Sequence, residues 1–430
     1  MRIEILKKIK KKKFTVSIIG LGYIGLPIAL SFAKKNIKVI GIDKDITKIK
    51  KLKNSISYIN TVDQKLIKSC IKKGNLFFSN NYNGIGLVDV IIICVPTPIK
   101  KNRKPNMEYV QEAVKKISNK IKKGQIIILE CTTYPGTSEK YFLPIFNKKK
   151  FTVGKNIFLG YSPEREDPGN KKYSVLKGNI NKIVSGYSRN CLTMVNEVYK
   201  FITKKTYKVS NIKTAEFTKL LENIYRSVNI GLVNELNHLC VKLGINIYES
   251  IEAAKSKPFG YQAFYPGPGV GGHCIPVDPY YLSWIAEKKG IKTDFIKLAG
   301  NINRKRPLEV SNYIKKQKVH KILLLGLSYK DNSDDLRDAP SIKIYNNLKK
   351  TKKIFVCDPC VDKEEIRKSF KKATVKDLKN LNKNFLSNID LLVILNKHKE
   401  INYKLIKSQS KLILDCKNVF KKKYENVLKV

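Results

Sequence analysis

A glycine-rich turn between a predicted strand and a predicted helix restricts the fold of this chain more than any other feature. Residues Phe14–Ile19 form a short apolar run with β-branched side chains, typical of a buried parallel strand. The spacing Gly-x-Gly-x-x-Gly follows at Gly20–Gly25, and residues 26–35 are predicted to form a helix. Glycines in this order permit a tight turn and let the backbone approach a phosphate group at the helix N-terminus. The segment therefore predicts a parallel α/β unit with a dinucleotide site.

An acidic residue further along supports this interpretation. Asp43 ends the next predicted strand, Lys38–Ile42, about 20 residues after the turn. Its carboxylate would accept hydrogen bonds from the ribose hydroxyls and repel a 2′-phosphate, which predicts NAD rather than NADP as the cofactor. The glycine spacing alone predicts little, because Gly267–Gly272 repeats it with no strand before and no helix after. We expect there a glycine-rich loop that serves a ligand beside Cys274.

Alternating strands and helices predict two α/β domains joined by a helical middle part. Further buried strands are predicted at 88–95, 125–130, 321–325, 354–357, 391–395 and 412–414. Such alternation indicates parallel, doubly wound sheets whose ligands lie outside the carboxyl ends of the strands. Between about residues 214 and 304 no strand is predicted, and 214–244 is predicted to form one long helix. We expect a Rossmann-type NAD-binding domain at 14–212, a central helical domain with the Cys274 loop at 213–305, and a C-terminal Rossmann-like α/β domain at 318–430.

The positive charge of the chain is spread along its length. Lys and Arg number 85 against 35 Asp and Glu, which gives a net charge of +50, but nine of these cations are Arg and the rest are Lys. Proteins that read nucleic acids cluster their cations and use Arg for bidentate contacts. We therefore expect no specific nucleic-acid partner, only weak and salt-sensitive attraction to polyanions.

Cysteine usage and the N-terminal segment bear on the compartment. Nine cysteines at irregular spacing do not form a disulfide framework and indicate a reducing compartment, so we expect a cytoplasmic location. The basic run Lys7–Lys13 and the uncharged stretch 14–33 resemble a signal peptide or membrane anchor, but glycines and a proline interrupt the stretch. We predict no membrane segment and interpret Met1–Lys13 as a disordered extension.

The long predicted helix has two contrasting faces. Lys219, Asn223 and Arg226 lie at i, i+4 and i+7 and share a polar face. This face is either a solvated surface or a site for an anionic transition state and an amide-bearing substrate, and the pattern leaves both interpretations open. The opposite, apolar side is expected to contain Phe217, Leu220, Leu221, Ile224, Val228 and Leu232.

Cys274 is the cysteine whose surroundings favour chemistry. It lies among glycines and prolines, where a purely structural core role is less expected than for a strand cysteine such as Cys94. Its neighbour His273 is not expected to pair with it, because adjacent side chains rarely point at one another. Cys357-x-x-Cys360 has the spacing of a metal-binding or redox motif, but the sequence lacks a second such cysteine pair, so no metal site is predicted.

Several segments together resemble the nucleotide-sugar 6-dehydrogenases, the family of UDP-glucose dehydrogenase, in family order along nearly the whole chain. They are GLGYIGLP (Gly20–Pro27), VPTP (Val95–Pro98), ECTTYPGT (Glu130–Thr137), SPEREDPG (Ser162–Gly169), KLLENIYRSVNIGLVNE (Lys219–Glu235), FYPGPGVGGHCIPVDP (Phe264–Pro279), GLSYKDNSDDLRDAP (Gly326–Pro340) and Asp358-Pro359. The short SPEREDPG loop, ENIYRSVNI and the segment around Cys274 most resemble the branch that oxidises UDP-N-acetylhexosamines, in particular UDP-N-acetyl-D-glucosamine.

The resemblance implies a four-electron oxidation of a primary alcohol that uses two NAD⁺ per sugar. Cys274 would attack the intermediate aldehyde to give a thiohemiacetal, a second oxidation would give a thioester, and water would hydrolyse it. Lys219 and Asn223 would stabilise negative charge on oxygen. Asp278 and Thr132 would order the water, and Glu164 would be a further carboxylate near C6.

The resemblance also implies the binding residues and partners. The cofactor is expected to contact Gly20, Gly22, Tyr23, Ile24, Gly25, Asp43, Lys48, Pro96, Thr97, Thr132 and Arg337. The UDP-sugar is expected to contact Glu164, Arg165, Lys219, Asn223, Arg226, Phe264, Tyr265, Gly267, Gly269, Gly271, Gly272 and Lys330. The long helix is expected to pack against its twin in a homodimer, and the product is expected to enter surface polysaccharide or O-antigen synthesis.

Alternative functions remain open at this point. UDP-glucose, UDP-N-acetylmannosamine and UDP-N-acetylgalactosamine are alternative substrates within the same family. A dehydrogenase of the 6-phosphogluconate or 3-hydroxyacid type shares the two-domain plan but needs no thiolate, so the GGHC sequence at Gly271–Cys274 argues against it. A basic polyanion-binding protein would explain the charge of +50 but not the glycine turn with Asp43 and Cys274.

Overall fold

The computed structural model describes residues 1–166 and 173–430, so the last three residues of the SPEREDPG segment lie outside the described residues. The chain forms two compact units, each of which is described by itself. Unit 1 contains Met1–Glu222 and Tyr280–Lys289, and unit 2 contains Asn223–Pro279 and Gly290–Val430. The division into segments 14–212, 213–305 and 318–430 stays a prediction.

Unit 1 is built on one sheet. Its strands are β1 (Thr15–Ile19), β2 (Lys38–Ile42), β3 (Leu76–Ser79), β4 (Val90–Ile93), β5 (Ile126–Leu129), β6 (Phe158–Tyr161), β7 (Lys182–Gly186) and β8 (Thr206–Lys208), in the order β3-β2-β1-β4-β5-β6-β7-β8. The pair β6–β7 is antiparallel and the other neighbours are parallel. The strand order reverses between β1 and β4, which is the topological switch point where a doubly wound sheet binds its ligand.

Helices cover the sheet of unit 1. They are α1 (Arg2–Lys10), α2 (Gly25–Lys34), α3 (Ile46–Lys53), α4 (Gln64–Lys72), α5 (Glu108–Ser118), α6 (Thr137–Lys148) and α7 (Arg189–Tyr199), with 3₁₀ turns η1 (Asn83–Leu87) and η2 (Val175–Lys177). The strands are apolar on both faces, as β4 and β5 show with every residue buried. Such continuous burial is what a parallel sheet between helical layers requires.

The N-terminal segment is not the disordered extension that the lysine run predicts. Residues Arg2–Lys10 form α1, and Ile9 is fully buried in the core of unit 1. Lys8 forms an ion pair with Asp89 at 2.5 Å. The prediction failed because one apolar residue per helical turn is enough to dock a short basic helix, while the lysines remain in solvent.

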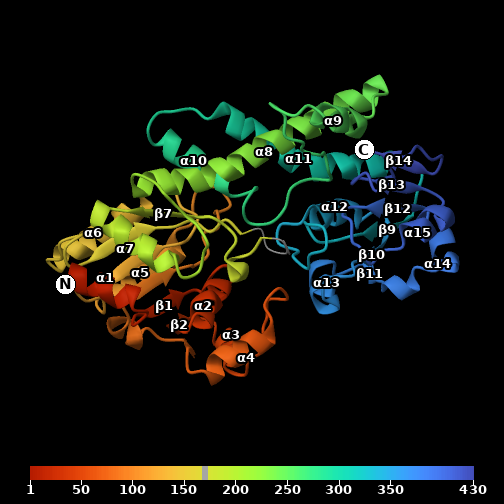
Figure 1. The fold of residues 1–430 in the computed structure, drawn as a ribbon. Coiled ribbons are helices and arrows are strands. Elements are labelled where there is room, and N and C mark those ends of the chain that lie inside the picture. Colours follow the sequence, from red (N-terminus) through yellow and green to blue (C-terminus); the bar gives the residue numbers. More distant parts are fainter. Residues whose placement is uncertain (167–172) are drawn as a thin grey trace. The chain divides into compact units, whose positions relative to one another are not determined.

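A helical part separates the two sheets along the sequence. It contains α8 (Ile212–Leu243), α9 (Ile247–Lys255), α10 (Asp278–Glu287) and α11 (Asp294–Lys316), and Figure 1 draws α8 as one continuous helix. The absence of strands between these helices agrees with the prediction for this part of the chain, all of which the structure describes.

The predicted apolar side of α8 is divided between burial and solvent. Leu220 and Ile224 are buried, whereas Phe217, Leu221 and Leu232 are 41–51% exposed. The polar face is divided as well, because Asn223 is buried, Lys219 is half-buried and Arg226 is exposed. The helical spacing of the apolar residues therefore predicted the helix, but it did not predict which of its residues are buried.

Unit 2 carries the second sheet, in which all neighbouring strands are parallel. Its strands are β9 (Lys321–Leu325), β10 (Lys353–Cys357), β11 (Thr374–Val375), β12 (Leu391–Ile394), β13 (Ile413–Asp415) and β14 (Val427–Lys429), in the order β11-β10-β9-β12-β13-β14. Its helices are α12 (Pro340–Leu348), α13 (Lys363–Ser369), α14 (Lys383–Ser387) and α15 (Tyr403–Gln409), with the 3₁₀ turn η3 (Leu378–Asn380). The order reverses between β9 and β12, which places a second switch point there.

Two apolar clusters lie on opposite faces of the second sheet. One contains Ile322 and Leu324 of β9 with residues of α12 and α13, and the other contains Leu323 and Leu325 with residues of α14 and α15. Successive side chains of a strand point to opposite faces, so β9 serves both clusters. Figure 1 shows α12 and α13 on one side of the strands and α14 and α15 on the other.

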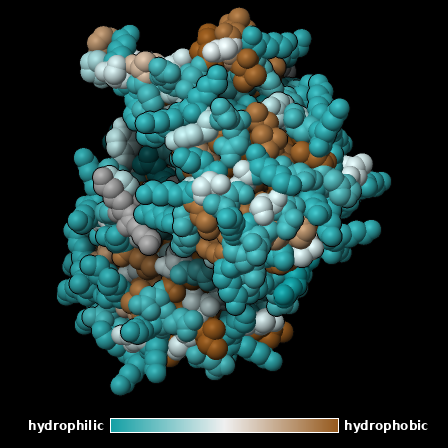
Figure 2. All heavy atoms as spheres, turned by 90° about the vertical axis from the view of Figure 1, so that its right-hand side faces the viewer, coloured by the Kyte–Doolittle hydropathy of each residue, from teal (hydrophilic) through white to brown (hydrophobic). Residues whose placement is uncertain are grey.

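The surface follows the composition. On the face drawn in Figure 2, hydrophilic residues predominate and interrupt the hydrophobic groups. In the parts of the chain that the structure describes, no helix combines the length and the apolar character needed to cross a membrane.

Candidate active site

The glycine turn of unit 1 has the geometry that the sequence predicts. Gly20 adopts a φ of +92°, and a Cβ there would lie 2.7 Å from the carbonyl oxygen of Cys94. At Gly25 a Cβ would lie 1.8 Å from the carbonyl oxygen of Gly20, so both positions exclude a side chain. At Gly22 a Cβ would meet nothing within 4 Å. The turn is therefore closed toward the protein and open at Gly22, at the N-terminus of α2, where a pyrophosphate fits. Tyr23 and Ile24 complete the turn and are half-buried.

Asp43 is held at the end of β2 beside this turn. Its carboxylate accepts hydrogen bonds from the backbone N–H of Leu21 at 2.9 Å and from that of Asp45 at 3.0 Å. The Nζ atom of Lys48 lies 3.9 Å from Asp43 Oδ2. The structure thus brings together the two residues that were predicted for the adenosine end of the cofactor.

The segment after β4 borders the same switch point. Pro96 is exposed and Thr97 is half-buried. The Tyr281 hydroxyl donates to the carbonyl oxygen of Thr97 at 2.9 Å, and lies 3.1 Å from that of Pro98. The short proline-rich segment is therefore fixed by a side chain nearly 200 residues away in the sequence, which the motif alone did not indicate.

A buried ion cluster follows β5 and β6. Lys182 donates to carboxylate oxygens of Glu130 and of Glu164, the latter at 2.7 Å, and all three side chains are almost fully buried. Glu164 also accepts from the backbone N–H groups of Arg165 and Glu166, each at 2.6 Å. The sequence predicted Glu164 but missed Lys182 and the carboxylate of Glu130.

The cluster shifts the ionisation of its members. Burial raises the pKa of Glu130 to about 7, although Lys182 opposes this. For Glu164 burial also acts to raise the pKa, but Lys182 and the two backbone donors outweigh it and hold the pKa below the usual value. Burial alone would lower the pKa of Lys182, and the two carboxylates raise it instead. Glu164 and Lys182 are therefore charged at neutral pH.

Two further predicted residues of unit 1 lie near this cluster in the sequence. Thr132 is half-buried in the segment that follows β5. Arg165 forms an ion pair with Glu222 at 2.7 Å, and its guanidinium also donates to the carbonyl oxygen of Asn181 at 3.1 Å. Arg165 was predicted to contact substrate, and here it holds an internal ion pair.

The cysteine loop of unit 2 joins the predicted nucleophile to two buried polar residues. Cys274 is exposed, and its carbonyl oxygen accepts from the backbone N–H of Asp278 at 2.8 Å, which closes a turn at the start of α10. Asn223 Nδ2 donates to Asp278 Oδ2, and both side chains are at least 95% buried. Three residues from two distant segments, each predicted to be catalytic, thus share one hydrogen-bonded arrangement.

The glycine loop before Cys274 packs against the segment that follows β9. The backbone N–H of Gly272 donates to the carbonyl oxygen of Arg337 at 2.8 Å. A Cβ at Gly271 would lie 2.5 Å from Cβ of Tyr329, so the close approach requires glycine there. Arg306 donates to the carbonyl oxygen of Gly267 at 3.0 Å and fixes the beginning of the loop.

The remaining residues predicted for this loop vary in exposure. Phe264 packs edge-on against Tyr225 with ring centroids 5.6 Å apart, whereas Tyr265 is exposed and its hydroxyl donates to Glu252 at 2.6 Å. Gly269 adopts a φ of +134° beside Pro307. The loop is thus an ordered element of unit 2 and not a second dinucleotide turn.

Lys330 and Arg337 lie in the segment after β9 that meets the glycine loop. Lys330 is half-buried. The Arg337 guanidinium makes a bidentate ion pair with Asp335, with Nε 2.8 Å from Oδ1. Arg337 was predicted to contact the cofactor, and in this structure its charge is neutralised within unit 2.

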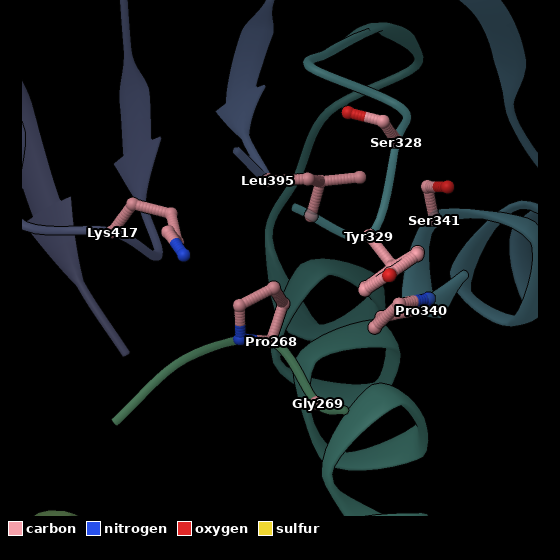
Figure 3. A pocket seen from close by; sticks show the side chains of 8 residues that line it. All are labelled: Pro268, Gly269, Ser328, Tyr329, Pro340, Ser341, Leu395 and Lys417. Carbon is pink, nitrogen blue, oxygen red and sulfur yellow. The ribbon is translucent and has the colours of Figure 1, made fainter. Parts of the chain in front are cut away.

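A pocket opens at the second switch point (Figure 3). Its lining residues come from the glycine loop, from the ends of β9 and β12, from the start of α12 and from the segment after β13: they are Pro268, Gly269, Ser328, Tyr329, Pro340, Ser341, Leu395 and Lys417. The Lys417 amino group points toward the other lining side chains and lies 3.3 Å from Asp331. A cation beside a tyrosine and two serines suits an anionic, ring-bearing ligand. The sequence missed Lys417 because nothing local distinguishes it from the other lysines.

Three segments of the chain match consecutive domains of one enzyme family. Residues 14–203 match the NAD binding domain of the UDP-glucose/GDP-mannose dehydrogenase family, residues 213–305 its central domain, and residues 323–422 its UDP binding domain.

Characterised relatives cover most of the chain. A UDP-N-acetyl-D-glucosamine 6-dehydrogenase of Pseudomonas aeruginosa is 35% identical over 82% of this chain and 85% of its own length. A UDP-N-acetyl-D-mannosamine dehydrogenase of Methanocaldococcus jannaschii is 34% identical over 94% of this chain and 92% of its own length. The solved structure of the UDP-N-acetyl-mannosamine dehydrogenase Cap5O from Staphylococcus aureus superposes with a TM-score of 0.82 at 32% identity, over 96% of this chain and 97% of that one.

Proposed function

The chain belongs to the UDP-glucose/GDP-mannose dehydrogenase family, whose members are NAD-dependent oxidoreductases, and we propose that it oxidises the C6 hydroxyl of a UDP-N-acetylhexosamine to the carboxylate. Our preferred substrate is UDP-N-acetyl-D-glucosamine. UDP-N-acetyl-D-mannosamine is the second candidate, because relatives named for each sugar match this chain at nearly the same identity. UDP-glucose and UDP-N-acetylgalactosamine remain alternatives within the family.

The arrangement of Cys274, Asp278 and Asn223 carries this proposal. Oxidation of an alcohol to an acid passes through an aldehyde, and a thiol that adds to the aldehyde retains it as a thiohemiacetal. Loss of a hydride and a proton then gives a thioester, and attack by water releases the carboxylate and the Cys274 thiol. Asp278 is anchored by the Asn223 amide and by its place at the start of α10. An anchored carboxylate close in sequence to the thiol is suited to order and deprotonate that water.

NAD⁺, when bound, accepts the hydride in each of the two oxidations. The open space at Gly22 and the positive end of α2 fit its pyrophosphate, and Asp43 fits its ribose. For Lys219 we propose charge stabilisation on oxygen, for Thr132 water binding, and for Glu164 a carboxylate near C6. The ion pair with Lys182 supports a charged Glu164 in that role.

The decisive experiment counts NADH from purified protein with excess NAD⁺ and limiting UDP-sugar. Two NADH per UDP-N-acetyl-D-glucosamine, with little from UDP-glucose or UDP-N-acetyl-D-mannosamine, is the expected result. One NADH per sugar would contradict the thioester route, and strong turnover of another UDP-sugar would overturn the substrate.

The role of Cys274 has its own test. We expect Cys274→Ala to abolish acid formation while calorimetric NAD⁺ binding stays unchanged. Cys240→Ala, a half-buried cysteine of α8, is the matched control and should retain activity. Full turnover in the Cys274 variant would remove this thiol from the mechanism.

We further propose a homodimer formed through α8. Beyond residue 224 this helix exposes Tyr225, Leu232, Leu236, Leu239 and Leu243, each at least 40% exposed. Their spacing places them along one stripe of the helix, and contiguous exposed apolar surface favours association. Light scattering should give a dimer for the unmodified chain and a monomer for Leu232→Glu combined with Leu239→Glu. Lys242→Glu on the same helix is the control, and a monomer without any substitution would refute the dimer.

A cytoplasmic location and a role in polysaccharide precursor synthesis complete the proposal. None of the nine cysteines, all of which the structure describes, forms a disulfide bond, which suits a reducing compartment. Fractionation of the source cells, with the NADH assay as readout, tests the location.

A further inference from the structure

Three side chains form a cluster at the carboxyl ends of strands in unit 2. Asp358 directly follows β10, Cys360 lies two residues further on, and His398 follows β12. Their potential ligand atoms all lie within 4.8 Å of one another. The sequence excluded a metal site because Cys357-x-x-Cys360 lacks a second pair. The strand order β10-β9-β12 instead supplies a histidine from a distant segment.

The imidazole of His398 is held from both sides. Its Nε2 atom lies 3.3 Å from Asp358 Oδ2, and its Nδ1 atom lies 3.4 Å from Cys360 Sγ, while the ring itself is fully buried. Asp358 accepts hydrogen bonds from four backbone N–H groups, which fits a carboxylate. A neighbouring carboxylate accepts a hydrogen bond from the Nε2–H group of a neutral imidazole, which leaves Nδ1 unprotonated on the side of the thiol.

Asp358 orients the imidazole and is not itself available as a ligand. Its Oδ2 atom accepts from the backbone N–H groups of Leu327 and Ser328, and its Oδ1 atom from those of Cys360 and Val361. A histidine that binds a metal through one nitrogen usually donates its other N–H to such a fixed carboxylate.

The distance between the thiol and the imidazole fits a bridging ion. Zinc binds thiolate sulfur at about 2.3 Å and imidazole nitrogen at about 2.0–2.1 Å, and a tetrahedral angle between these bonds places S and N about 3.5 Å apart. The observed separation of Cys360 Sγ and His398 Nδ1 is 3.4 Å. The separation of the two ligand atoms therefore matches that of atoms bound to one ion.

The local charge favours a cation although the chain as a whole carries +50. The carboxylates of Asp358, Glu400 and Asp334 act electrostatically on Cys360. The same carboxylates attract a divalent cation, and the bound cation stabilises the thiolate.

We propose that Cys360 and His398 bind a thiophilic divalent cation, zinc, with Asp358 as the residue that orients the imidazole. The Cys360 thiol releases one proton to solvent as the S–Zn bond forms, and no electron is transferred. The other two positions of a tetrahedral ion are available to water. Ser328, which lines the pocket of unit 2, approaches His398 Nε2 within 3.5 Å, so the site borders that pocket.

The test uses the full chain after treatment with a chelator, in a Cys274→Ala background because the exposed thiol of Cys274 could bind metal by itself. Calorimetric titration with ZnCl₂ in two buffers of different ionisation enthalpy should give one saturable site and release of about one proton per ion. Titration with CoCl₂ should give the charge-transfer absorption of a cobalt–thiolate bond.

Matched variants assign the ligands. Cys360→Ser should lose the cobalt–thiolate absorption and saturable zinc binding, whereas Cys240→Ser should retain both. His398→Gln, checked for folding by circular dichroism, should weaken zinc binding at least tenfold. Absence of saturable binding in the parent chain would overturn the proposal, as would an unchanged cobalt spectrum in Cys360→Ser.

Discussion

Lys182 is buried between Glu130 and Glu164, so replacing it with methionine removes the cation that both carboxylates share. Methionine has a similar length and is apolar, so the substitution deletes the charge with little change in volume. The side chains of Lys182 and Glu164 are 5% and 4% exposed and that of Glu130 is fully buried, so water cannot take over the role of the ammonium group.

The expected cost follows from the burial of the carboxylates. Removing one partner of a buried ion pair typically costs about 3–5 kcal/mol, because the charge left behind is uncompensated. Lys182 has two such partners, so we expect a loss in the free energy of unfolding of about 3–5 kcal/mol at pH 7.5. The hydroxyl of Tyr199, which donates to Glu130, remains and compensates only one of the two carboxylates.

The cost should depend on pH in a defined direction. In the parent protein the pKa of Glu164 is held below its usual value, and without Lys182 burial would raise it. A carboxyl group with a raised folded-state pKa contributes stability below its unfolded pKa of about 4.3 and loses it as the pH rises through the folded value. In the variant, Glu164 should therefore lose stability with rising pH as Glu130 does, whose pKa is already about 7. The destabilisation by Lys182→Met should therefore be smaller at pH 5.5 than at pH 7.5, by at most about 1.4 kcal/mol per pH unit for each added proton.

Urea denaturation at pH 5.5, 6.5 and 7.5 measures this effect. The single tryptophan, Trp284, packs against Tyr134 with ring centroids 4.8 Å apart within unit 1, so its fluorescence reports on the unit that contains Lys182. Lys200→Met is the matched control, because Lys200 forms an ion pair with Glu197 but is 55% exposed, and should cost less than about 1 kcal/mol. A cost for Lys182→Met that is as small as this, or that does not change with pH, would refute the reasoning.

Three further tests concern the remaining parts of unit 1. Gly25→Ala should disrupt the dinucleotide turn, because its Cβ would lie 1.8 Å from a backbone carbonyl oxygen. Gly22→Ala should fold normally by circular dichroism and lose NAD⁺ affinity in calorimetry. Equal NAD⁺ binding by both variants would contradict the assignment of this turn to the pyrophosphate. Asp43→Ala should reduce the preference for NAD⁺ over NADP⁺ in the ratio of kcat/KM values, and an unchanged ratio would remove Asp43 from ribose recognition. Ile9→Ala should cost about 2–5 kcal/mol in urea denaturation, since Ile9 is fully buried, while Ile3→Ala at an exposed position of the same helix should be nearly neutral.

The strands were the most predictable elements of the fold. The run Lys321–Leu325 is a strand with the predicted bounds, and Phe14–Ile19 differs from β1 by one residue. Parallel strands between two helical layers are apolar on both faces, so their sequence is a short continuous run that few other structures share. The strands β3, β7, β8, β11 and β14 were not predicted. β3, β8, β11 and β14 lie at sheet edges, and β7 (KIVSG) contains only two consecutive strongly apolar residues.

The candidate site was predictable where the chemistry lies in a local motif. The glycine turn with Asp43, and the loop with Cys274 and Asp278, each combine residue types at spacings that backbone geometry requires. No local motif distinguishes Lys182 from the many other lysines, and its carboxylate partners lie 52 and 18 residues away in the sequence. Its burial depends on β7 pairing beside β6, which no local pattern indicates.

By itself, the sequence determined the family, the cofactor and the order of the motifs, because glycine turns, strand runs and a loop cysteine are local and depend on backbone geometry. Tertiary structure alone decided which of the similar side chains act together. It selected Lys182 and Lys417 among the lysines, docked Ile9 into the core and placed His398 beside Cys360. The physical reason is that these contacts join segments far apart in the chain. Their formation depends on strand order and on the desolvation of particular side chains, and neither of these produces a periodic pattern in the sequence.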